Sequence, residues 1–303
     1  SAHAGVPKSS NSRGVFYYYE TVKQSLSLQW LSIDEAPRVL GQLIAVGSMA
    51  SLVVYAFLWF AQDQFGLSYQ IIYLLGGGIC LLLTAFAWLG FPRFENTTPQ
   101  RKHLLMRKRY WLYYALTFMG GARRQIFVVF AGFLMVEKFG YSVSDIVALY
   151  LINHLFNWAF AGKIGALVGR IGERRALTFE YCGLICVFTA YAFVDSALWA
   201  ASLYVLDHLF FSLAIAIKTY FQKIADPADM ASTAGVAFTI NHIAAVAIPA
   251  AFGLVWLVSP AAVFLMGTGM AAISLVLARN IPTDPRAGNE VVMGRVAGVA
   301  VSP

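Results

Sequence analysis

The residues in this sequence that are best suited to bind a solute or carry a proton are charged and polar side chains embedded in long apolar stretches. Arg123, Arg124 and Gln125 follow a pair of glycines in the middle of one apolar block, and Asp207 and His208 lie in the middle of another. A charged group near the centre of a bilayer costs several kcal/mol, so such groups usually serve a pathway or an ion pair. These residues are therefore candidates for contacting a solute inside a membrane.

The two adjacent arginines have two interpretations. Neighbouring residues on a helix point about 100° apart, so at least one of Arg123 and Arg124 should meet a polar cavity or a carboxylate. The first interpretation is that the pair binds a substrate, and two basic residues weakly indicate an anionic one. The alternative is a structural ion pair for which Asp207 is the candidate partner. Asp207 is equally a candidate proton carrier, and His154 and His208 are candidates for proton exchange near neutral pH.

Other apolar blocks also carry polar residues at mid-depth. Asn153, His154 and Asn157 have the spacing of one helix face, which suits either a pathway or hydrogen bonds between helices. Since no nucleophile–base set and no metal-ligand spacing occurs, the sequence predicts no catalytic residue, no metal site and no cofactor. The predicted pathway residues are Arg123, Arg124, Gln125, Asn153, His154, Asn157, Asp207, His208, Asn241 and His242.

Composition indicates that lipid surrounds the elements that position these residues. Of the 303 residues, 59% are hydrophobic and 12% are charged, whereas soluble domains carry about 25% charged residues. A spanning helix needs about 20 apolar residues and satisfies its own backbone hydrogen bonds. The sequence therefore predicts an all-α integral membrane protein. Its about eight transmembrane helices are expected at 39–60, 68–91, 110–136, 143–162, 174–195, 198–221, 233–257 and 259–279.

The lysines and arginines that lie in loops are concentrated in alternate loops. The loops at 32–38, 92–109, 163–175 and 222–232 and the tail hold 14 of the 22 lysines and arginines, whereas the loops between them hold Lys138 alone. Because short basic loops stay on the cytoplasmic side, this pattern predicts a multi-pass protein of the inner or plasma membrane with a cytoplasmic C-terminus. Nucleic acid is not an expected partner, since the charges lie in loops and not on a face interleaved with exposed aromatics.

The loop after the fourth predicted span carries spaced glycines and arginines. Gly165, Arg170, Gly172 and Arg174 resemble the short cytoplasmic loop signature of the major facilitator superfamily. That signature is a glycine, three residues, Asp-Arg, one residue, a glycine and then basic residues. Here Gly169 takes the aspartate position, and Glu173 takes the first basic position. The alternative interpretation is an ordinary basic loop.

The resemblance implies a major-facilitator-like helical bundle that is truncated at its N-terminus. It implies a remnant of the N-terminal bundle at 1–91 (with 15–31 similar to the fourth helix), a basic inter-bundle loop at 92–109, the complete C-terminal six-helix bundle at 110–279, and a disordered cytoplasmic tail at 280–303. The first three helices of the family's fold are expected to be absent, so transport is expected to need those helices or a partner chain.

The predicted function is secondary active transport of a small solute by alternating access, with the proton as candidate coupling ion. In the family, the first, second, fourth and fifth helices of the second half surround the central cavity, and the predicted pathway residues lie on the corresponding four spans. The alternative is a non-transporting membrane scaffold or a truncated transporter relic. An intramembrane enzyme is a third class, and no enzyme motif in the sequence supports it.

Overall fold

The computed structural model describes residues 12–66, 68–90, 98–101, 103–104 and 106–293. Within these ranges the backbone is mainly helical and contains no strand, which confirms the predicted all-α fold. The helices are α1 (Ser12–Trp30), α2 (Ala36–Phe65), α3 (Tyr69–Gly90), α4 (Trp111–Gln125), α5 (Gly132–Phe139), α6 (Val143–Ile171), α7 (Glu173–Phe193), α8 (Ala197–Phe211), α9 (Ile215–Ile224), α10 (Met230–Trp256) and α11 (Pro260–Arg279).

Among the described residues, 7 segments are long and apolar enough to cross a membrane. One of them, Lys108–Phe139, joins α4 to α5 through a π-helical stretch at Ile126–Ala131, and another, Ala197–Ile224, joins α8 to α9. The fourth predicted span, 143–162, corresponds to α6, which is a 29-residue helix but is not one of the seven. We attribute this to the polar groups of Asn153, His154 and Asn157, which lower its apolar character. The weak segment at 15–31 corresponds to α1, which is also not one of the seven.

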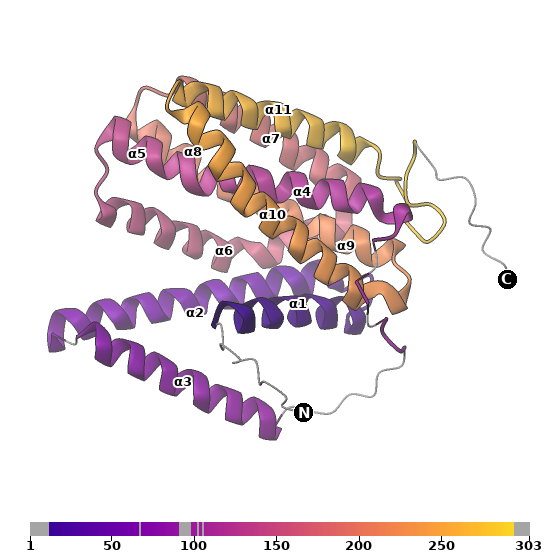
Figure 1. Cartoon of the computed structure of the whole chain (residues 1–303), viewed down its shortest axis with the longest axis horizontal. Helices are drawn as coiled ribbons and strands as arrows, with labels where there is room; N and C mark the ends of the chain where they lie inside the picture. Colours follow the sequence, from indigo (N-terminus) through magenta and orange to yellow (C-terminus); the bar gives the residue numbers. More distant parts are fainter. Residues whose placement is uncertain (1–11, 67, 91–97, 102, 105, 294–303) are drawn as a thin grey trace, which may run out of the picture.

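The helices divide into two groups, which contact each other mainly along α2 and α6 (Figure 1). Helices α4 to α11 form one bundle, α2 packs against α6, and α1 packs against α9 and α10. The apolar side chains of α3 are almost all exposed, as expected for a helix surrounded by lipid. We call α1–α3 the first half and α4–α11 the second half.

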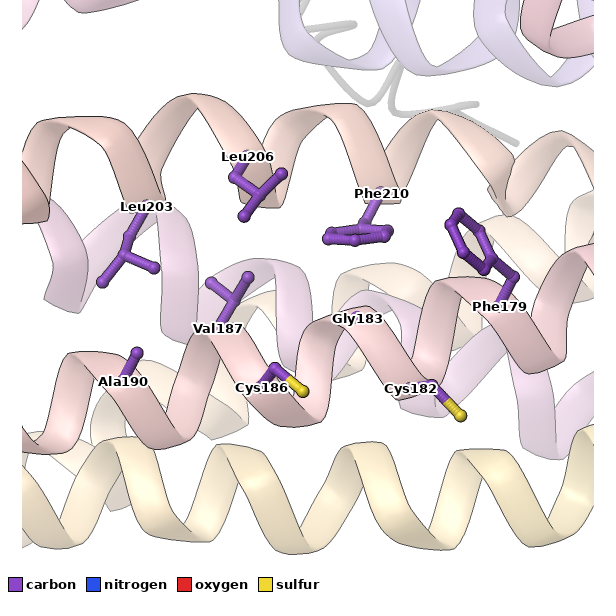
Figure 2. Close-up of a pocket in the computed structure, with 9 residues that line it drawn as sticks. All are labelled: Phe179, Cys182, Gly183, Cys186, Val187, Ala190, Leu203, Leu206 and Phe210. Carbon is purple, nitrogen blue, oxygen red and sulfur yellow. The ribbon is translucent and has the colours of Figure 1, made fainter.

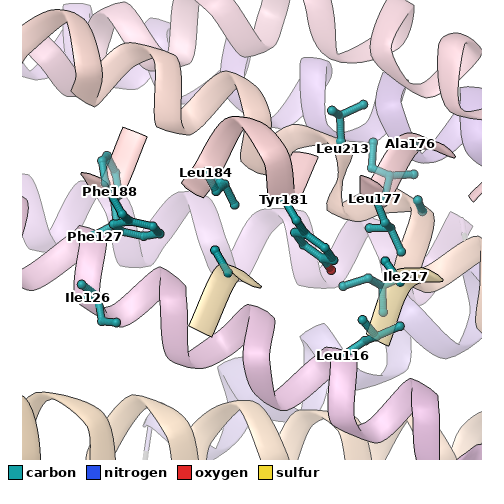
Figure 3. Close-up of a cluster of buried hydrophobic side chains, with 14 of the residues drawn as sticks. Leu116, Ile126, Phe127, Ala176, Leu177, Tyr181, Leu184, Phe188, Leu213 and Ile217 are labelled. Carbon is teal, nitrogen blue, oxygen red and sulfur yellow. The ribbon is translucent and has the colours of Figure 1, made fainter. Parts of the chain in front are cut away.

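The second half has a dense core rich in aromatic side chains. Tyr191 stacks on Phe264 with ring centroids 5.0 Å apart, so α7 and α11 lie in close contact. Figure 3 shows the part of this core where α7 meets α4, the π-helical stretch and α9. Its labelled residues are Leu116, Ile126, Phe127, Ala176, Leu177, Tyr181, Leu184, Phe188, Leu213 and Ile217. This packing makes the second half a rigid frame for the polar residues that it carries.

An ion-pair network fastens residues 98–101 and 106–110 to the second half. The side chain of Asp229 is 1% exposed and pairs with Arg107 and, at 3.3 Å, with Arg101. It also accepts a hydrogen bond from the Tyr110 hydroxyl at 3.0 Å. We call the end of the molecule that carries this network and the turn at Gly172 the basic end; it lies at the right of Figure 1. The described part of the predicted 92–109 loop is therefore held to the second half.

The expectation of a disordered tail does not hold for residues 280–293. The Asn280 side chain donates to the Met293 carbonyl at 3.1 Å and accepts from the Met293 amide at 2.6 Å. The Tyr220 hydroxyl donates to the Glu290 carbonyl at 2.6 Å, and the Glu290 carboxylate lies 3.6 Å from Arg109. The segment is ordered because side chains of the second half satisfy its backbone. Residues 294–303 lie outside the described part.

Candidate functional site

The glycine pair before the arginines lets α4 approach its neighbours closely. A Cβ on Gly121 would lie 3.4 Å from the Asn241 Cα atom and 3.5 Å from the Ala244 Cβ atom, both on α10. A Cβ on Gly120 would lie 3.7 Å from Ile217 of α9. The glycines therefore serve helix packing, and the chain changes to π-helical hydrogen bonding only after Gln125. Since π-helical turns are rare and frequently occur at functional sites, this change marks the segment around the arginines.

Arg123 points into the interior of the second half. Its side chain is 1% exposed, and its Nη2 atom lies 3.7 Å from the Oε1 atom of Glu180 on α7. Its guanidinium lies 4.4 Å from the centre of the Tyr181 ring. The structure thus gives Arg123 a carboxylate partner, but this partner is Glu180 and not the expected Asp207.

Asp207 belongs to the same buried charged group. It lies on α8 with its side chain buried, and its charge interacts with those of Arg123 and Glu180. We call Arg123, Glu180 and Asp207 the buried triad. One guanidinium thus faces two carboxyl groups inside a membrane-spanning bundle.

Arg124 points in a different direction from its neighbour. Its side chain is exposed, and its guanidinium lies 5.7 Å from the centre of the Phe211 ring at the end of α8. Its charge interacts with those of His208 and Lys218. Within the described part of the chain, Arg124 forms no ion pair.

Lys218 is a site residue that the sequence analysis did not include. It lies on α9 four residues before Gln222, whose side chain donates hydrogen bonds to the carbonyl oxygens of Leu28 at 2.9 Å and Leu31 at 2.7 Å. Residues four apart share a helix face, so Lys218 also faces α1. Its charge interacts with those of Glu20 and Lys23 on α1, and its side chain is exposed.

Together these residues form a charged surface between the halves. We call it the inter-half face: Arg124, His208 and Lys218 of the second half, with Glu20 and Lys23 of α1. The sequence signal for it was present in the two charges of the weakly apolar segment 15–31. The position of Lys218 along its helix could be estimated from the sequence, but the contact between α9 and α1 could not.

The polar residues of α6 take separate positions. Asn153 is buried, and the His154 ring lies 5.7 Å from the ring of Tyr55 on α2. The Asn157 side-chain oxygen accepts a hydrogen bond from the Ser212 hydroxyl at 3.2 Å. The interpretation as hydrogen bonding between helices therefore holds for Asn157, whereas His154 lies where α6 meets the first half.

The glycine and arginine loop motif lies where the two halves touch. A Cβ on Gly165 of α6 would collide with the backbone carbonyl of Pro37, and one on Gly41 of α2 would collide with the carbonyl of Ala161. Gly172 has a φ of 81°, a conformation that favours glycine, and it turns the chain from α6 into α7. Glycine is thus required at positions 165 and 41 by the close approach of α2 and α6, and at position 172 by the backbone conformation of the turn.

The charged residues of the motif show how this chain departs from the family pattern. Glu173, at the position of a basic residue, is buried and lies 2.7 Å from Lys223 at the end of α9. Arg170 is exposed and Arg174 is half-buried at the same turn. The acidic residue therefore joins the motif to the end of α9 by an ion pair.

Comparison with known proteins decides the family. Residues 19–249 match the Major Facilitator Superfamily. The chain belongs to this superfamily. It is also 26% identical over 152 residues to an uncharacterized MFS-type transporter of Methanocaldococcus jannaschii, a match that covers 48% of this chain and 37% of that relative. The family predicted from the loop motif is confirmed, and with its apolar helices the protein is a multi-pass membrane protein of a transporter family.

Three further predicted residues lie near the α4–α10 contact of this superfamily member. Asn241 is exposed beside Gly121. The His242 ring stacks on Phe238 of the same helix, with centroids 3.9 Å apart. Gln125 is half-buried on α4. The place of these three residues in a pathway stays a prediction.

The superfamily member also has an apolar groove between α7 and α8 (Figure 2). The Phe210 ring lies against Gly183, and Cys182 and Cys186 point from successive turns of α7. The groove, of about 390 Å³, is lined by Phe179, Cys182, Gly183, Cys186, Val187, Ala190, Leu203, Leu206 and Phe210. It holds none of the predicted pathway residues, so it is not the candidate solute site.

Proposed function

We propose that this protein is a secondary active transporter that moves a small solute by alternating access between its halves. The observation that best supports this is the contact of the halves near the basic end. It includes glycine backbones, Gly41 against α6 and Gly165 against α2, the hydrogen bonds from Gln222 to α1, and the packing of α1 against α10.

The arrangement of α2 and α6 supports one closed and one open end. Figure 1 shows the two helices side by side near the basic end and spreading toward the opposite end. The inter-half face lies between these ends. We propose that the basic end and the C-terminus are cytoplasmic, in the inner or plasma membrane, because lysine and arginine concentrate there. The structure then corresponds to a state closed toward the cytoplasm.

The buried triad is a candidate for coupling to protons. With both carboxyl groups ionised, Arg123, Glu180 and Asp207 carry a formal charge of −1, and one bound proton makes the group neutral. Uncompensated charge inside a membrane is costly, so a change in the surroundings of the triad is expected to bind or release that proton. We propose that Asp207, which forms no ion pair within 4.0 Å among the described residues, exchanges it.

Uptake into proteoliposomes tests this function. We expect saturable, protein-dependent uptake of at least one labelled solute from a panel of anionic, neutral and cationic compounds, driven by an imposed pH gradient. Asp207→Asn should abolish accumulation against a concentration gradient but retain exchange of solute across the membrane, because the amide cannot carry the proton. The exposed Asp284→Asn serves as control and should accumulate solute like the unmodified protein.

Two outcomes would count against the proposal. If accumulation is unchanged when Arg123, Arg124 and Asp207 are replaced in turn, the assigned pathway is wrong. If a folded protein neither exchanges nor accumulates any compound, the scaffold interpretation is favoured instead. Protonophore addition separates the coupling from transport itself, because it should collapse accumulation and spare exchange.

A further inference from the structure

We propose that the transported solute is an organic anion whose carboxylate or phosphate group binds between Arg124 and Lys218 at the inter-half face. This inference rests on the proposed transport function and names the solute class for it. It also gives the two adjacent arginines different roles: Arg124 binds the solute, and Arg123 belongs to the buried triad.

The charge balance of the inter-half face favours an anion. Arg124, Lys218 and Lys23 supply three cations, whereas Glu20 supplies one carboxylate and already pairs with Lys23 at 3.6 Å. In the described residues neither Arg124 nor Lys218 has an ion pair of its own. Like charges repel each other, and an anion placed between them converts this repulsion into attraction.

Helix packing places the two cations on neighbouring elements. Gly120 of α4 lies against Ile217 of α9, the residue before Lys218, and Arg124 lies one turn further along α4, near Phe211. A guanidinium can hold two oxygens of a carboxylate or phosphate in its plane, and an ammonium adds a point charge. The Phe211 ring supplies an apolar surface for the rest of an organic anion.

Arg123 does not offer the same chemistry. It is buried, and its charge is opposed by Glu180 at 3.7 Å and by Asp207. Arg124 and Lys218 are exposed; Arg124 forms no ion pair among the described residues, and Glu20, the carboxylate whose charge interacts with that of Lys218, is already paired with Lys23. An incoming anion therefore finds unmatched positive charge at the inter-half face and not at the buried triad.

The position of Lys218 also connects the bound anion to closure. Lys218 lies one turn from Gln222, which donates to the carbonyl oxygens of Leu28 and Leu31 on α1. An anion held by Lys218 thus lies beside the contact that has to open when solute passes through the basic end. The residue that binds the anion and the residue whose hydrogen bonds must break for opening therefore lie on the same face of α9.

Thermal unfolding of the purified, detergent-solubilised protein tests the inference. Benzoate and phenyl phosphate serve as anionic probes, and benzamide, benzyl alcohol and benzylamine serve as neutral and cationic counterparts of similar size. We expect benzoate or phenyl phosphate to raise the Tm saturably, and the counterparts to leave it unchanged. The two anions distinguish a carboxylate from a phosphate preference.

Substitutions assign the effect to residues. Arg124→Gln and Lys218→Gln should each weaken anion binding about tenfold or more, since each removes a charge-assisted hydrogen bond. Lys218→Arg should retain most of the affinity, and Arg175→Gln, an exposed cation at the start of α7, should bind like the unmodified protein. Size-exclusion profiles and the Tm without ligand show that each variant is folded.

The results separate this inference from the transport function. Anion binding that is unchanged in both glutamine variants, or equal binding of the neutral compounds, would overturn the inference. So would a Tm that no anion raises in a protein that still takes up a neutral or cationic solute. Anion binding lost in the variants but without uptake of any solute supports the site and counts against transport.

Discussion

Replacing Arg123 with methionine is expected to lower the free energy of unfolding by about 3–5 kcal/mol, the usual cost of breaking a buried ion pair from one side. The substitution leaves Glu180 and Asp207 buried without the cation that both carboxyl groups face. The measurement is the unfolding midpoint in detergent, followed by the intrinsic fluorescence of the protein. Arg124→Met removes an exposed arginine one residue away and should cost about 1 kcal/mol or less.

A double substitution gives this prediction its control. Arg123→Met with Glu180→Leu removes both partners of the 3.7 Å pair and should recover part of the lost stability, because a matched apolar pair leaves fewer unpaired charges. If Arg123→Met is as stable as the unmodified protein, or if Arg124→Met is the more damaging change, the assignment of the two arginines is wrong.

Gly165→Ala is expected to abolish most transport by preventing closure at the basic end. The added Cβ would collide with the backbone carbonyl of Pro37, and neither backbone can move without separating α2 from α6. Overpacking of this kind typically costs about 1–3 kcal/mol, which shifts an open–closed equilibrium by about 5- to 150-fold toward the open state. The measurement is the initial rate of solute uptake into proteoliposomes.

Gly162→Ala is the matched control, because it lies one turn away on α6 and its Cβ would meet only Gln42 at an ordinary 3.6 Å. It should transport at close to the unmodified rate. Equal rates for the two variants would show that the close approach of Gly165 to α2 has no part in the transport cycle.

The helices could be predicted from the sequence, but the directions of their side chains could not. The bilayer sets a minimum length of apolar residues, so spans such as 174–195 coincide closely with α7 (Glu173–Phe193). The turn at Gly172 was also predictable, since its spacing from Gly165 belongs to a known motif. Both signals are local in the chain.

The site depended on contacts between distant segments. The sequence indicated that at least one of Arg123 and Arg124 meets a polar cavity or a carboxylate, with Asp207 as the candidate partner. The pairing of Arg123 with Glu180 depends on the contact of α4 with α7. Lys218 was missed because its role follows from the contact of α9 with α1, which joins segments far apart in the chain. The order of residues 280–293 was not predicted because it depends on hydrogen bonds made by Tyr220, which is far away in the chain, and by Asn280 at the start of the tail.

The distance between α2 and α6 at the basic end tests the central claim most directly. Spin labels on Arg38→Cys and Leu167→Cys, both exposed beside the Gly41–Gly165 contact, report it after the exposed Cys80, Cys182 and Cys186 are replaced by serine. A second pair, Trp59→Cys with Val147→Cys, reports the opposite end. Alternating access predicts a short and a long distance for the first pair, with pH or solute shifting the populations and the second pair changing in the opposite sense. A single short distance under every condition, with no change at the opposite end, would contradict it.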